Sequence, residues 1–378
     1  MRYIWQHIQA IIEAYKGDLP LAHFLKNYYK QHPILGSRDR KLLSAMGYSW
    51  YRCSRGIEGR EWLNGLMAQW LNAPGQFKNF SLDAWLEEAE IPFDSEALFP
   101  FDVLLSGGIT RDEWLQSMLV QPDLFIRIRK DKGKLISLLN GQNIPSADIT
   151  DTCLALPNGA KIDTLLPPDA YVVQDASSQK TGEFFKPHKN EQWYDCCSVA
   201  GGKSLLLKDM EPGVRLTVSD KRESIIHNLQ QRFRQYRYEL PVAHVTDVTN
   251  KEQLAKSLGG KQFDNIICDA PCSGSGTWAR TPEQLYFFDP CTIDKFSSLQ
   301  KTIAVNVSCH LKKGGRLIYI TCSVFHRENE AVVAEVTKET GMKLIQQQLI
   351  NGIGIKADSM FVAILSHSRD GMHSVSTM

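Results

Sequence analysis

The sequence predicts an α/β protein built on a doubly wound, mostly parallel sheet of seven strands, with helical and small α/β segments before it. Two observations carry this prediction. From about residue 171 onward, short apolar runs alternate with helical segments, as they do in parallel sheets whose faces are covered by helices. Before about residue 120, apolar residues recur at three- and four-residue steps instead, which is the spacing of helices that bury one face.

The chain divides by pattern into three predicted domains: a helical domain (1–120), a small α/β subdomain (121–170) and the doubly wound domain (171–378). Charge is uneven in the first of these. Residues 1–60 hold ten Lys and Arg against four Asp and Glu, whereas 61–115 hold two against ten. The first stretch therefore offers either a basic face for phosphate groups or an ordinary solvated helical surface.

Composition is that of a globular protein, with 43% hydrophobic residues among 378 and a formal net charge of +1. No apolar run reaches the roughly 18 residues of a membrane-spanning helix. The N-terminus lacks the apolar centre of a signal peptide, so we expect a cytosolic protein. The nine cysteines include no CxxC pair, so zinc spacing is missing and no metal is expected.

The small subdomain begins with a predicted strand in "DLFIRIRK" (123–130), where apolar and basic residues alternate. This alternation is typical of a half-exposed strand and would place Arg127 and Arg129 on one face. The alternative is an edge strand with charged outer positions. A helix in "KGKLISLLNGQ" (132–142) is expected to follow.

Seven strands are expected in the last domain, and ligands of such sheets bind at the carboxyl ends of the strands near the switch in strand order. The expected strands are "WYDCC" (193–197), "RLTVSD" (215–220), "VAHVTD" (242–247), "NIICDA" (265–270), "RLIYITC" (316–322), "KLIQQQ" (343–348) and "SMFVAIL" (359–365).

A glycine-rich loop follows the first of these strands, in "YDCCSVAGGKS" (194–204). Gly201 and Gly202 allow close approach of a ligand to the backbone at a helix N-terminus. One candidate ligand is a nucleotide phosphate, because the loop nearly matches the P-loop pattern, with Asp269 then holding magnesium; but Cys197 stands where that pattern needs its first glycine. The other candidate is S-adenosylmethionine.

S-adenosylmethionine needs an acid for its ribose hydroxyls as well as an approachable backbone. Asp220 ends the second strand of the domain, 25 residues after Asp195, which is about the spacing of a ribose-binding acid in a doubly wound fold. Asp247 ends the predicted third strand, where an adenine edge could be met. A single acid at such a place would be an ordinary loop or cap residue. Acids in series, beside a glycine loop, favour the cofactor.

Two predicted strands each deliver a cysteine to a loop, in "DAPCSGSGT" (269–277) and "TCS" (321–323). A thiolate that adds to C6 of cytosine lets C5 take a methyl group, and a second group must then help to undo the adduct. Cys322 precedes the predicted helix "ENEAVVAEVTKE" (328–339), whose N-terminal dipole would favour a thiolate. Cys272 lies in a loop rich in backbone N–H donors.

These cysteine motifs resemble those of the RNA cytosine-C5 methyltransferases of the Sun/NOP type. The resemblance covers about residues 120–378, and the helical N-terminus resembles the NusB-like or family-specific RNA-binding extension. It implies a Rossmann-like class I S-adenosylmethionine-dependent methyltransferase domain after an RRM-like subdomain. Supporting motifs are "VVQDASSQ" (172–179), "DCCSVAGGK" (195–203), "NE" (329–330) and "ADSMFVAIL" (357–365).

The resemblance implies a role for each matching residue. Cys322 would be the nucleophile, Cys272 would assist breakdown of the adduct, and Asp269 would hydrogen-bond the cytosine edge. Lys203 would lie beside the cofactor and this acid, and carbonyls around Pro271 near the methyl donor. The cofactor-binding residues expected are Cys197, Ser198, Val199, Ala200, Gly201, Gly202, Lys203, Asp220, Asp247, Asp269 and Pro271.

The implied substrate is RNA, with ribosomal RNA expected first, alone or within a ribosomal subunit or assembly intermediate, and transfer RNA second. The target base must be unstacked for attack on its ring face. Candidate RNA contacts are Arg127, Arg129, Lys203 and Arg280, with Lys130, Lys132 and Lys134 nearby. The sequence departs from the family where Ala200 replaces a proline and Ser198 an alanine. A P-loop nucleotide hydrolase and a catalytically silent RNA-binding assembly factor remain the alternatives.

Overall fold

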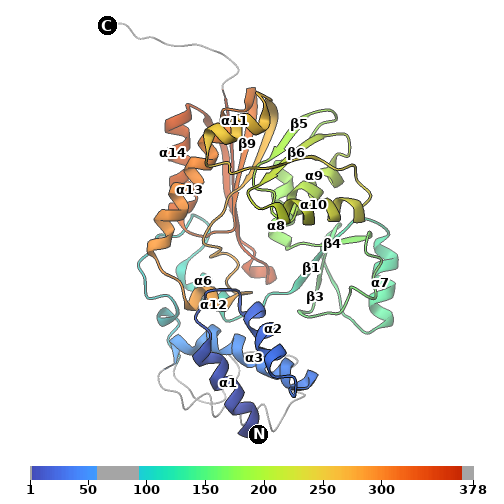
Figure 1. Cartoon of the computed structure of the whole chain (residues 1–378), viewed down its shortest axis with the longest axis vertical. Helices are drawn as coiled ribbons and strands as arrows, with labels where there is room; N and C mark the ends of the chain where they lie inside the picture. The colour runs from blue at the N-terminus through green and yellow to red at the C-terminus, as the bar shows by residue number, and fades with distance from the viewer. Residues whose placement is uncertain (1, 58–92, 368–378) are drawn as a thin grey trace. The chain divides into compact units, whose positions relative to one another are not determined.

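The computed structural model describes residues 2–57 and 93–367, so part of the predicted helical domain lies outside the described residues. The chain forms two compact units (Figure 1). Unit 1 comprises residues 1–103, 110–122 and 277–290, and unit 2 comprises 104–109, 123–276 and 291–378. The predicted three-domain boundaries stay a prediction.

Unit 1 is helical in its described part. Its elements are α1 (Arg2–Ala14), α2 (Leu21–Gln31), α3 (Ser37–Cys53), η1 (Ser54–Gly56), η3 (Glu96–Leu98), α6 (Arg111–Met118) and α12 (Pro282–Tyr286). The helices predicted before residue 58 are therefore confirmed. The buried Arg52 guanidinium donates to the carbonyl oxygens of Met118 and Ala279, the latter at 2.8 Å. Segment 277–290, which follows the Cys272 loop in the sequence, thus packs with the N-terminal helices.

Unit 2 begins with a four-stranded antiparallel sheet in the order β2-β3-β1-β4. Its elements are β1 (Leu124–Ile128), α7 (Lys132–Gly141), β2 (Ala147–Thr150), β3 (Cys153–Leu156) and β4 (Tyr171–Val173). The predicted strand and helix are confirmed. The edge-strand alternative is wrong, because β1 pairs with β3 on one side and β4 on the other. The expectation of a half-exposed strand is wrong because the three central residues of β1 are all buried.

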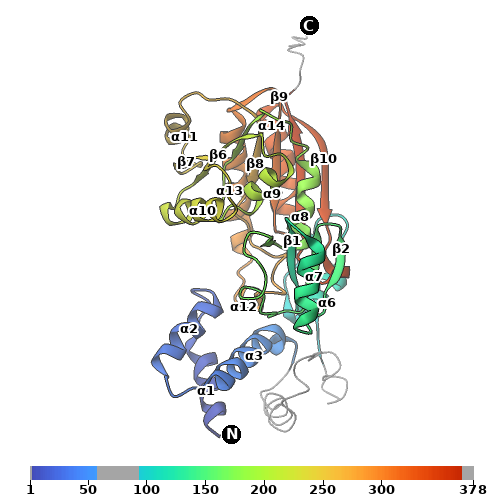
Figure 2. The same ribbon diagram turned by 90° about the vertical axis from the view of Figure 1, so that its right-hand side faces the viewer.

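The main sheet of unit 2 has seven strands in the order β10-β11-β9-β8-β5-β6-β7, with β7 and β10 at opposite edges (Figure 2). The pairs from β9 to β7 are parallel, whereas β11 runs antiparallel to both β9 and β10. All seven predicted strands are present: β5 (Gln192–Asp195), β6 (Arg215–Asp220), β7 (Val242–Val245), β8 (Phe263–Asp269), β9 (Leu311–Thr321), β10 (Lys343–Ile350) and β11 (Met360–Ser366).

Helices cover both faces of this sheet, with α9 and α10 on one face and α13 and α14 on the other (Figure 1). The helical elements are α8 (Ala176–Lys180), η4 (Thr181–Phe184), α9 (Gly202–Met210), α10 (Glu223–Gln235), α11 (Lys251–Leu258), α13 (Cys291–Ser308), η5 (His326–Glu328), α14 (Glu330–Thr340) and η6 (Ile353–Ile355). The core joins Leu205, Leu229 and Phe233 of α9 and α10 to Ile267 and Ile318 of the central strands, all fully buried.

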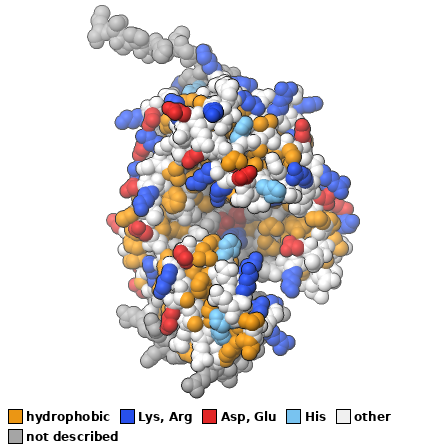
Figure 3. Space-filling model, viewed as in Figure 1, with side chains coloured by type: hydrophobic (Ala, Val, Ile, Leu, Met, Phe, Trp, Pro, Cys, Tyr) orange, Lys and Arg blue, Asp and Glu red, His pale blue; other side chains and the backbone are white. Residues whose placement is uncertain are grey.

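The surface carries both signs of charge. On the face shown in Figure 3, Lys and Arg side chains of the described residues are interspersed with Asp and Glu. No helix in the described ranges is long and apolar enough to cross a membrane.

Candidate active site

The carboxyl edge of the parallel strands brings the predicted motifs together. Strands β6 and β7 follow on one side of β5, and strands β8 and β9 follow on its other side. The switch in strand order therefore lies between β5 and β8, which is where ligands bind in such sheets. The loops after β9, β8, β5, β6 and β7 lie next to one another in that order. They carry the predicted nucleophile, acid and cofactor residues.

The glycine loop after β5 turns sharply into α9. Gly201 takes a φ of 78° at the N-cap of α9, and a Cβ there would lie 3.0 Å from Cγ of Leu229. At Gly202, no described heavy atom beyond its chain neighbours and the backbone of its own helix lies within 4 Å of the place that a Cβ would take. No side chain of the described residues caps α9, so its first N–H groups offer donors to a ligand.

The rest of this loop is fixed to β6 and α10. Ser198 donates from its backbone N–H and from its hydroxyl to the Ser219 carbonyl, at 3.0 and 3.1 Å, and Arg232 donates to the Ala200 carbonyl at 2.5 Å. Val199 adopts a φ of 44°, which is strained for a β-branched residue, and its side chain is exposed. Arg232 thus holds the backbone where the family usually has a proline.

The two acids predicted to meet the cofactor differ in their surroundings. Asp220 ends β6, as predicted, but its carboxylate already accepts three hydrogen bonds from Arg222 at 2.9 to 3.0 Å. Asp247 lies two residues beyond the end of β7, so the predicted strand is too long by that amount. Hydrogen bonds from the Thr249 hydroxyl and N–H lower the pKa of Asp247, which keeps its carboxylate ionised.

Together these residues fit S-adenosylmethionine. The uncapped first turn of α9 and the open space at Gly202 suit the methionine end, and carboxylates after β6 and β7 suit hydroxyl and amino groups. Asp220 can serve the ribose only if Arg222 shares or releases it. Cys197 is half-buried in this loop. A hydrogen bond with Cys196 lowers its pKa, but burial and the charges of Cys268, Asp195 and Asp269 outweigh this effect, so the net shift of the pKa is upward. Cys197 is therefore a thiol lining the loop.

Lys203 and Asp269 form an ion pair between the loops after β5 and β8, with Nζ and Oδ2 2.6 Å apart. Burial lowers the pKa of Lys203, but the charges of Asp269, Cys322 and Asp195 outweigh it and the net shift is upward. The lysine is therefore a fixed cation in contact with the predicted acid. Its ammonium group donates to Asp269, which agrees with the role beside the acid, and its contact with an RNA phosphate stays a prediction.

Asp195 is a buried acid at the end of β5; in the sequence it counted among the acids in series and stood at the start of the glycine-loop motif, without a role of its own. Ser204 donates to Oδ2 at 2.6 Å, while Oδ1 has no partner among the described residues. Burial raises the pKa of Asp195 to about 7, with the charge of Asp269 adding to this and the Ser204 hydrogen bond and Lys203 opposing it. Its position at a strand end, two residues before the loop, was the available signal.

The two predicted cysteines face each other, with Sγ of Cys272 and Sγ of Cys322 3.2 Å apart. The pKa of Cys272 is raised well above its ordinary value by the hydrogen bond with Cys322, then by burial and by the charges of Cys322 and Glu328. Cys272 therefore holds its proton and can donate it toward Cys322. Cys322 is in turn one of the charges that raise the pKa of Lys203.

Backbone contacts hold the two cysteine loops together. The N–H of Gly276 donates to the Cys322 carbonyl at 2.9 Å, and the Gly276 carbonyl accepts from Ser359 N–H at the same distance. A Cβ at Gly276 would lie 2.1 Å from the Ser359 carbonyl oxygen, so only glycine fits. The carbonyl of Pro271, which was expected near the methyl donor, accepts a hydrogen bond from Gln300 at 2.9 Å.

The support that a helix N-terminus was expected to give Cys322 stays a prediction. Helix α14 begins only at Glu330, and the 3₁₀ helix η5 (His326–Glu328) lies between. The dipole effect fades within the first helical turn. Lys203 is a positive group that acts with Cys322, because the charge of Cys322 is among those that raise the pKa of this lysine.

The prediction that Arg127 and Arg129 contact RNA also needs correction. Both guanidinium groups pair with Asp209 of α9, with Arg129 Nε 2.8 Å from Oδ1, and their side chains are only 5% and 7% exposed. Arg127 also donates to Gln174 at 2.9 Å, and Arg129 lies over the ring of Tyr236. These arginines join the small sheet to α9 and are not exposed to a nucleic acid backbone.

The third predicted arginine, Arg280, is half-buried in unit 1, and its RNA contact stays a prediction.

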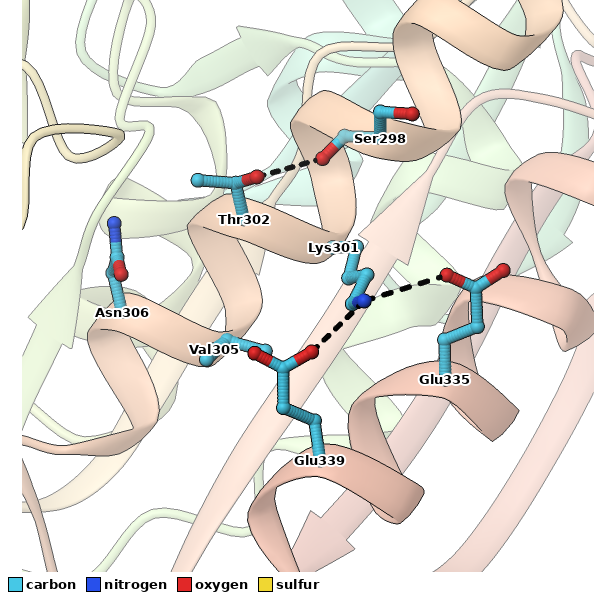
Figure 4. A pocket seen from close by; sticks show the side chains of 7 residues that line it. All are labelled: Ser298, Lys301, Thr302, Val305, Asn306, Glu335 and Glu339. Carbon is cyan, nitrogen blue, oxygen red and sulfur yellow. Dashed lines mark hydrogen bonds and ion pairs between the residues drawn. The ribbon is translucent and has the colours of Figure 1, made fainter.

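A separate cavity of about 310 Å³ lies between α13 and α14 (Figure 4). Lys301 reaches across it to Glu335 and Glu339, and no predicted site residue lines it.

The seven-stranded sheet with this carboxyl edge is the fold of class I methyltransferases, which confirms the predicted fold class. The match to a methyltransferase family confirms the predicted cofactor, S-adenosylmethionine. Residues 183–376 match the family described as 16S rRNA methyltransferase RsmB/F. The chain belongs to this family, as the cysteine motifs predicted.

Relatives agree with this assignment. The chain is 29% identical over 252 residues to Ribosomal RNA small subunit methyltransferase B of Shewanella oneidensis, a match that covers 64% of this chain and 58% of that protein. It spans about half the length of the curated relatives it matches.

Solved structures show the same fold. PH0851 superposes with a TM-score of 0.70 at 18% identity, covering 95% of this chain and 97% of that one. NSun6 from Pyrococcus horikoshii, solved with SFG, gives a TM-score of 0.59 at 15% identity over 68% of this chain and 94% of that one. At these identities the likeness concerns the fold alone.

Proposed function

We propose that this protein is an RNA methyltransferase that forms 5-methylcytosine through a covalent bond between Cys322 and C6 of the target cytosine. The observation that supports it most strongly is the pair of thiols 3.2 Å apart at the ends of adjacent parallel strands. The Lys203–Asp269 ion pair joins the ends of β5 and β8, the next pair of adjacent parallel strands. Two thiols suit a reaction that needs both an addition and an elimination.

In the proposed reaction, the thiolate of Cys322 forms a bond to C6, and the displaced ring electrons make C5 nucleophilic. The bound cofactor would supply the methyl group: as C5 bonds to that carbon, the carbon–sulfur bond of the sulfonium would break, its electron pair would stay on sulfur, and S-adenosylhomocysteine would be left. C5 then loses its proton to water, the electron pair of that C–H bond restores the ring double bond, and the C6–S bond breaks to return the thiolate. Cys272, as a thiol beside Cys322, assists this release.

Other residues orient the substrate in this proposal. Asp269, held by Lys203, accepts a hydrogen bond from the cytosine amino group. The Pro271 carbonyl, held by Gln300, lies near the methyl donor. The glycine loop (Cys197–Gly202), Asp220 and Asp247 bind the cofactor. Arg280 and the basic stretch in residues 1–57 contact the RNA backbone.

Small-subunit ribosomal RNA is the first candidate substrate, because the family description and the names of the relatives refer to it. Transfer RNA is the second. The ring faces of a stacked, paired cytosine are closed, so the target lies in a single-stranded or locally opened segment. A cytosolic location is part of this proposal.

The two alternatives find less support. A P-loop hydrolase needs a glycine where Cys197 stands, and membership in a methyltransferase family argues against it. A silent RNA-binding factor would not need two facing thiols beside a lysine–aspartate pair.

Product analysis tests the proposal. Protein, S-adenosylmethionine with a labelled methyl group and transcribed 16S rRNA or tRNA are mixed, and the RNA is digested to nucleosides for mass spectrometry. We expect labelled 5-methylcytidine from wild type and from Cys309→Ser, which changes an exposed cysteine, and none from Cys322→Ser. Label in a different nucleoside, or label that survives Cys322→Ser, would contradict it. Titration with ATP in place of S-adenosylmethionine separates the P-loop alternative.

A further inference from the structure

A fully buried carboxylate lies behind the two cysteines. Glu328 ends η5, and its side chain accepts hydrogen bonds from four donors on three elements. The donors are Ser273 N–H at 2.8 Å, Ser273 Oγ, Gln300 Nε2 at 3.1 Å and Ser323 Oγ. Its backbone carbonyl accepts a further bond from the hydroxyl of Tyr319, at 2.6 Å.

These donors are the immediate neighbours of the thiols. Ser273 follows Cys272 in the chain and Ser323 follows Cys322, so one carboxylate holds the residue beside each cysteine. Gln300 of α13 also donates to the carbonyl of Pro271, at 2.9 Å. Both flanks of Cys272 are therefore tied to a network whose centre is Glu328.

The charge on this carboxylate is costly. Burying an ion without a counter-ion is unfavourable, and among the described residues no Lys, Arg or His pairs with Glu328. Four hydrogen bonds offset part of that cost. A neutral amide of the same shape would avoid this cost but has only one acceptor oxygen for donors that reach both carboxylate oxygens. The carboxylate therefore supplies both the acceptors and a negative charge beside the thiols.

We propose that Glu328 is a positioning residue for the two-cysteine reaction: its carboxylate sets the separation of the loops and gives Cys272 and Cys322 unequal tasks. This inference rests on the proposed function. The charge of Glu328 acts on Cys272, whose other titratable neighbour is Cys322, and the two together with burial raise its pKa while a hydrogen bond from the Gly274 backbone opposes them. Cys272 then stays a thiol, and Cys322 remains the nucleophile.

Glu328→Gln tests this assignment, because it keeps the shape but removes the charge and places an amide N–H₂ against N–H donors. Glu335→Gln is the matched control: the same change at an exposed carboxylate of α14, paired with Arg327 and Lys301. Alkylation of each cysteine by iodoacetamide is followed by peptide mass spectrometry from pH 6 to pH 9.5, without RNA or cofactor.

In Glu328→Gln we expect alkylation of Cys272 near pH 8 to rise by about three- to ten-fold, because loss of the negative charge lowers the pKa of this thiol. Glu335→Gln should follow the wild-type profile. With RNA present, kcat should fall at least about ten-fold in Glu328→Gln while KM for S-adenosylmethionine stays within about two-fold. A role limited to stability would lower the thermal midpoint without this shift in pH profile.

A Cys272 profile in Glu328→Gln that matches wild type, with unchanged kcat, overturns the inference. Should Glu328→Gln not fold, Glu328→Asp decides: it keeps the charge but shortens the reach, so the pH profile should stay near wild type while kcat falls. A shifted profile with normal kcat in that variant would also contradict it. If the wild type methylates no cytosine, the proposed function fails, and the alkylation result still decides the effect of Glu328 on Cys272.

Discussion

The two ends of α9 each hold an ion pair, and they differ in what surrounds it. Lys203 lies in the first turn and Asp209 in the last, so each charge has the sign that the helix dipole disfavours. Lys203 is paired with Asp269 beside the cysteines, whereas Asp209 is paired with Arg127 and Arg129 of the small sheet. Both ends therefore need a partner of opposite charge.

The two aspartates differ in how many of their hydrogen-bonding positions are already occupied. Asp209 accepts from two arginines and from the Tyr238 hydroxyl at 2.6 Å, and its side chain is 16% exposed. Asp269 has one ion-pair partner, and its side chain is 25% exposed at the carboxyl edge of the sheet. An ion pair whose members are saturated stabilises the fold, while one with an open side at a strand end can bind a substrate.

Asp269→Asn should have the largest effect at the N-terminal end of α9. It removes the charge that holds Lys203 and the acceptor for the cytosine amino group, so we expect methyl transfer to fall by about 10³-fold or more. Asp269→Asn also leaves the buried Lys203 ammonium without its counter-ion, so the thermal midpoint should fall as well, and the rate is compared per folded molecule. Initial rates and thermal unfolding measured on the same preparation check both points. A fully active variant would remove this acid from the proposed site.

Asp209→Asn should act the opposite way at the other end. Two buried guanidinium groups lose their counter-ion, and we expect a loss of about 3 kcal/mol in the free energy of unfolding. The rate per folded molecule should stay within about three-fold of wild type. Urea unfolding with activity assays measures this, and Asp148→Asn, which breaks the exposed pair with Lys132, is the control. A loss of activity without a loss of stability would contradict this prediction, because Asp209 would then serve the reaction as Asp269 does.

Asp195→Asn should give the smallest effect, seen in the pH dependence of stability. Its pKa of about 7 lies above the unfolded value, so the folded state binds the extra proton between about pH 4 and 7 and loses stability as pH rises through 7. Wild type should lose about 2 kcal/mol more than the variant between pH 5 and pH 7. Thermal unfolding at several pH values shows whether the curve of Asp195→Asn is flatter. Parallel curves would mean that Asp195 does not titrate in this range.

Most of the seven strands were predictable because they are short apolar runs bounded by turn residues, as in "NIICDA" before the Cys272 loop. The cysteines, Lys203 and Asp269 were predictable from motif position, since carboxyl ends of parallel strands share one edge. Arg127 was assigned wrongly because its burial depends on Asp209, 82 residues away, and on β4, neither of which local alternation can reveal.

Other features were out of reach for a different reason. Segment 277–290 packs with the N-terminal helices, and no periodicity in its sequence indicates that partner. Glu328 was missed because an acid in "HRENE" resembles any helix-starting residue, and only the contacts with Ser273 and Ser323 show its place. The only indication in the sequence was that Glu328 follows Cys322 by six residues.

Covalent trapping tests the central claim most directly, namely that Cys322 bonds to the base and Cys272 helps to release it. Wild type, Cys272→Ala, Cys322→Ala and the double variant are mixed with S-adenosylmethionine and transcribed 16S rRNA, then separated on denaturing gels. We predict an RNA–protein adduct that accumulates in Cys272→Ala and is missing from both variants that lack Cys322. Accumulation in Cys322→Ala instead would reverse the two roles, and an adduct that persists in the double variant would contradict the account.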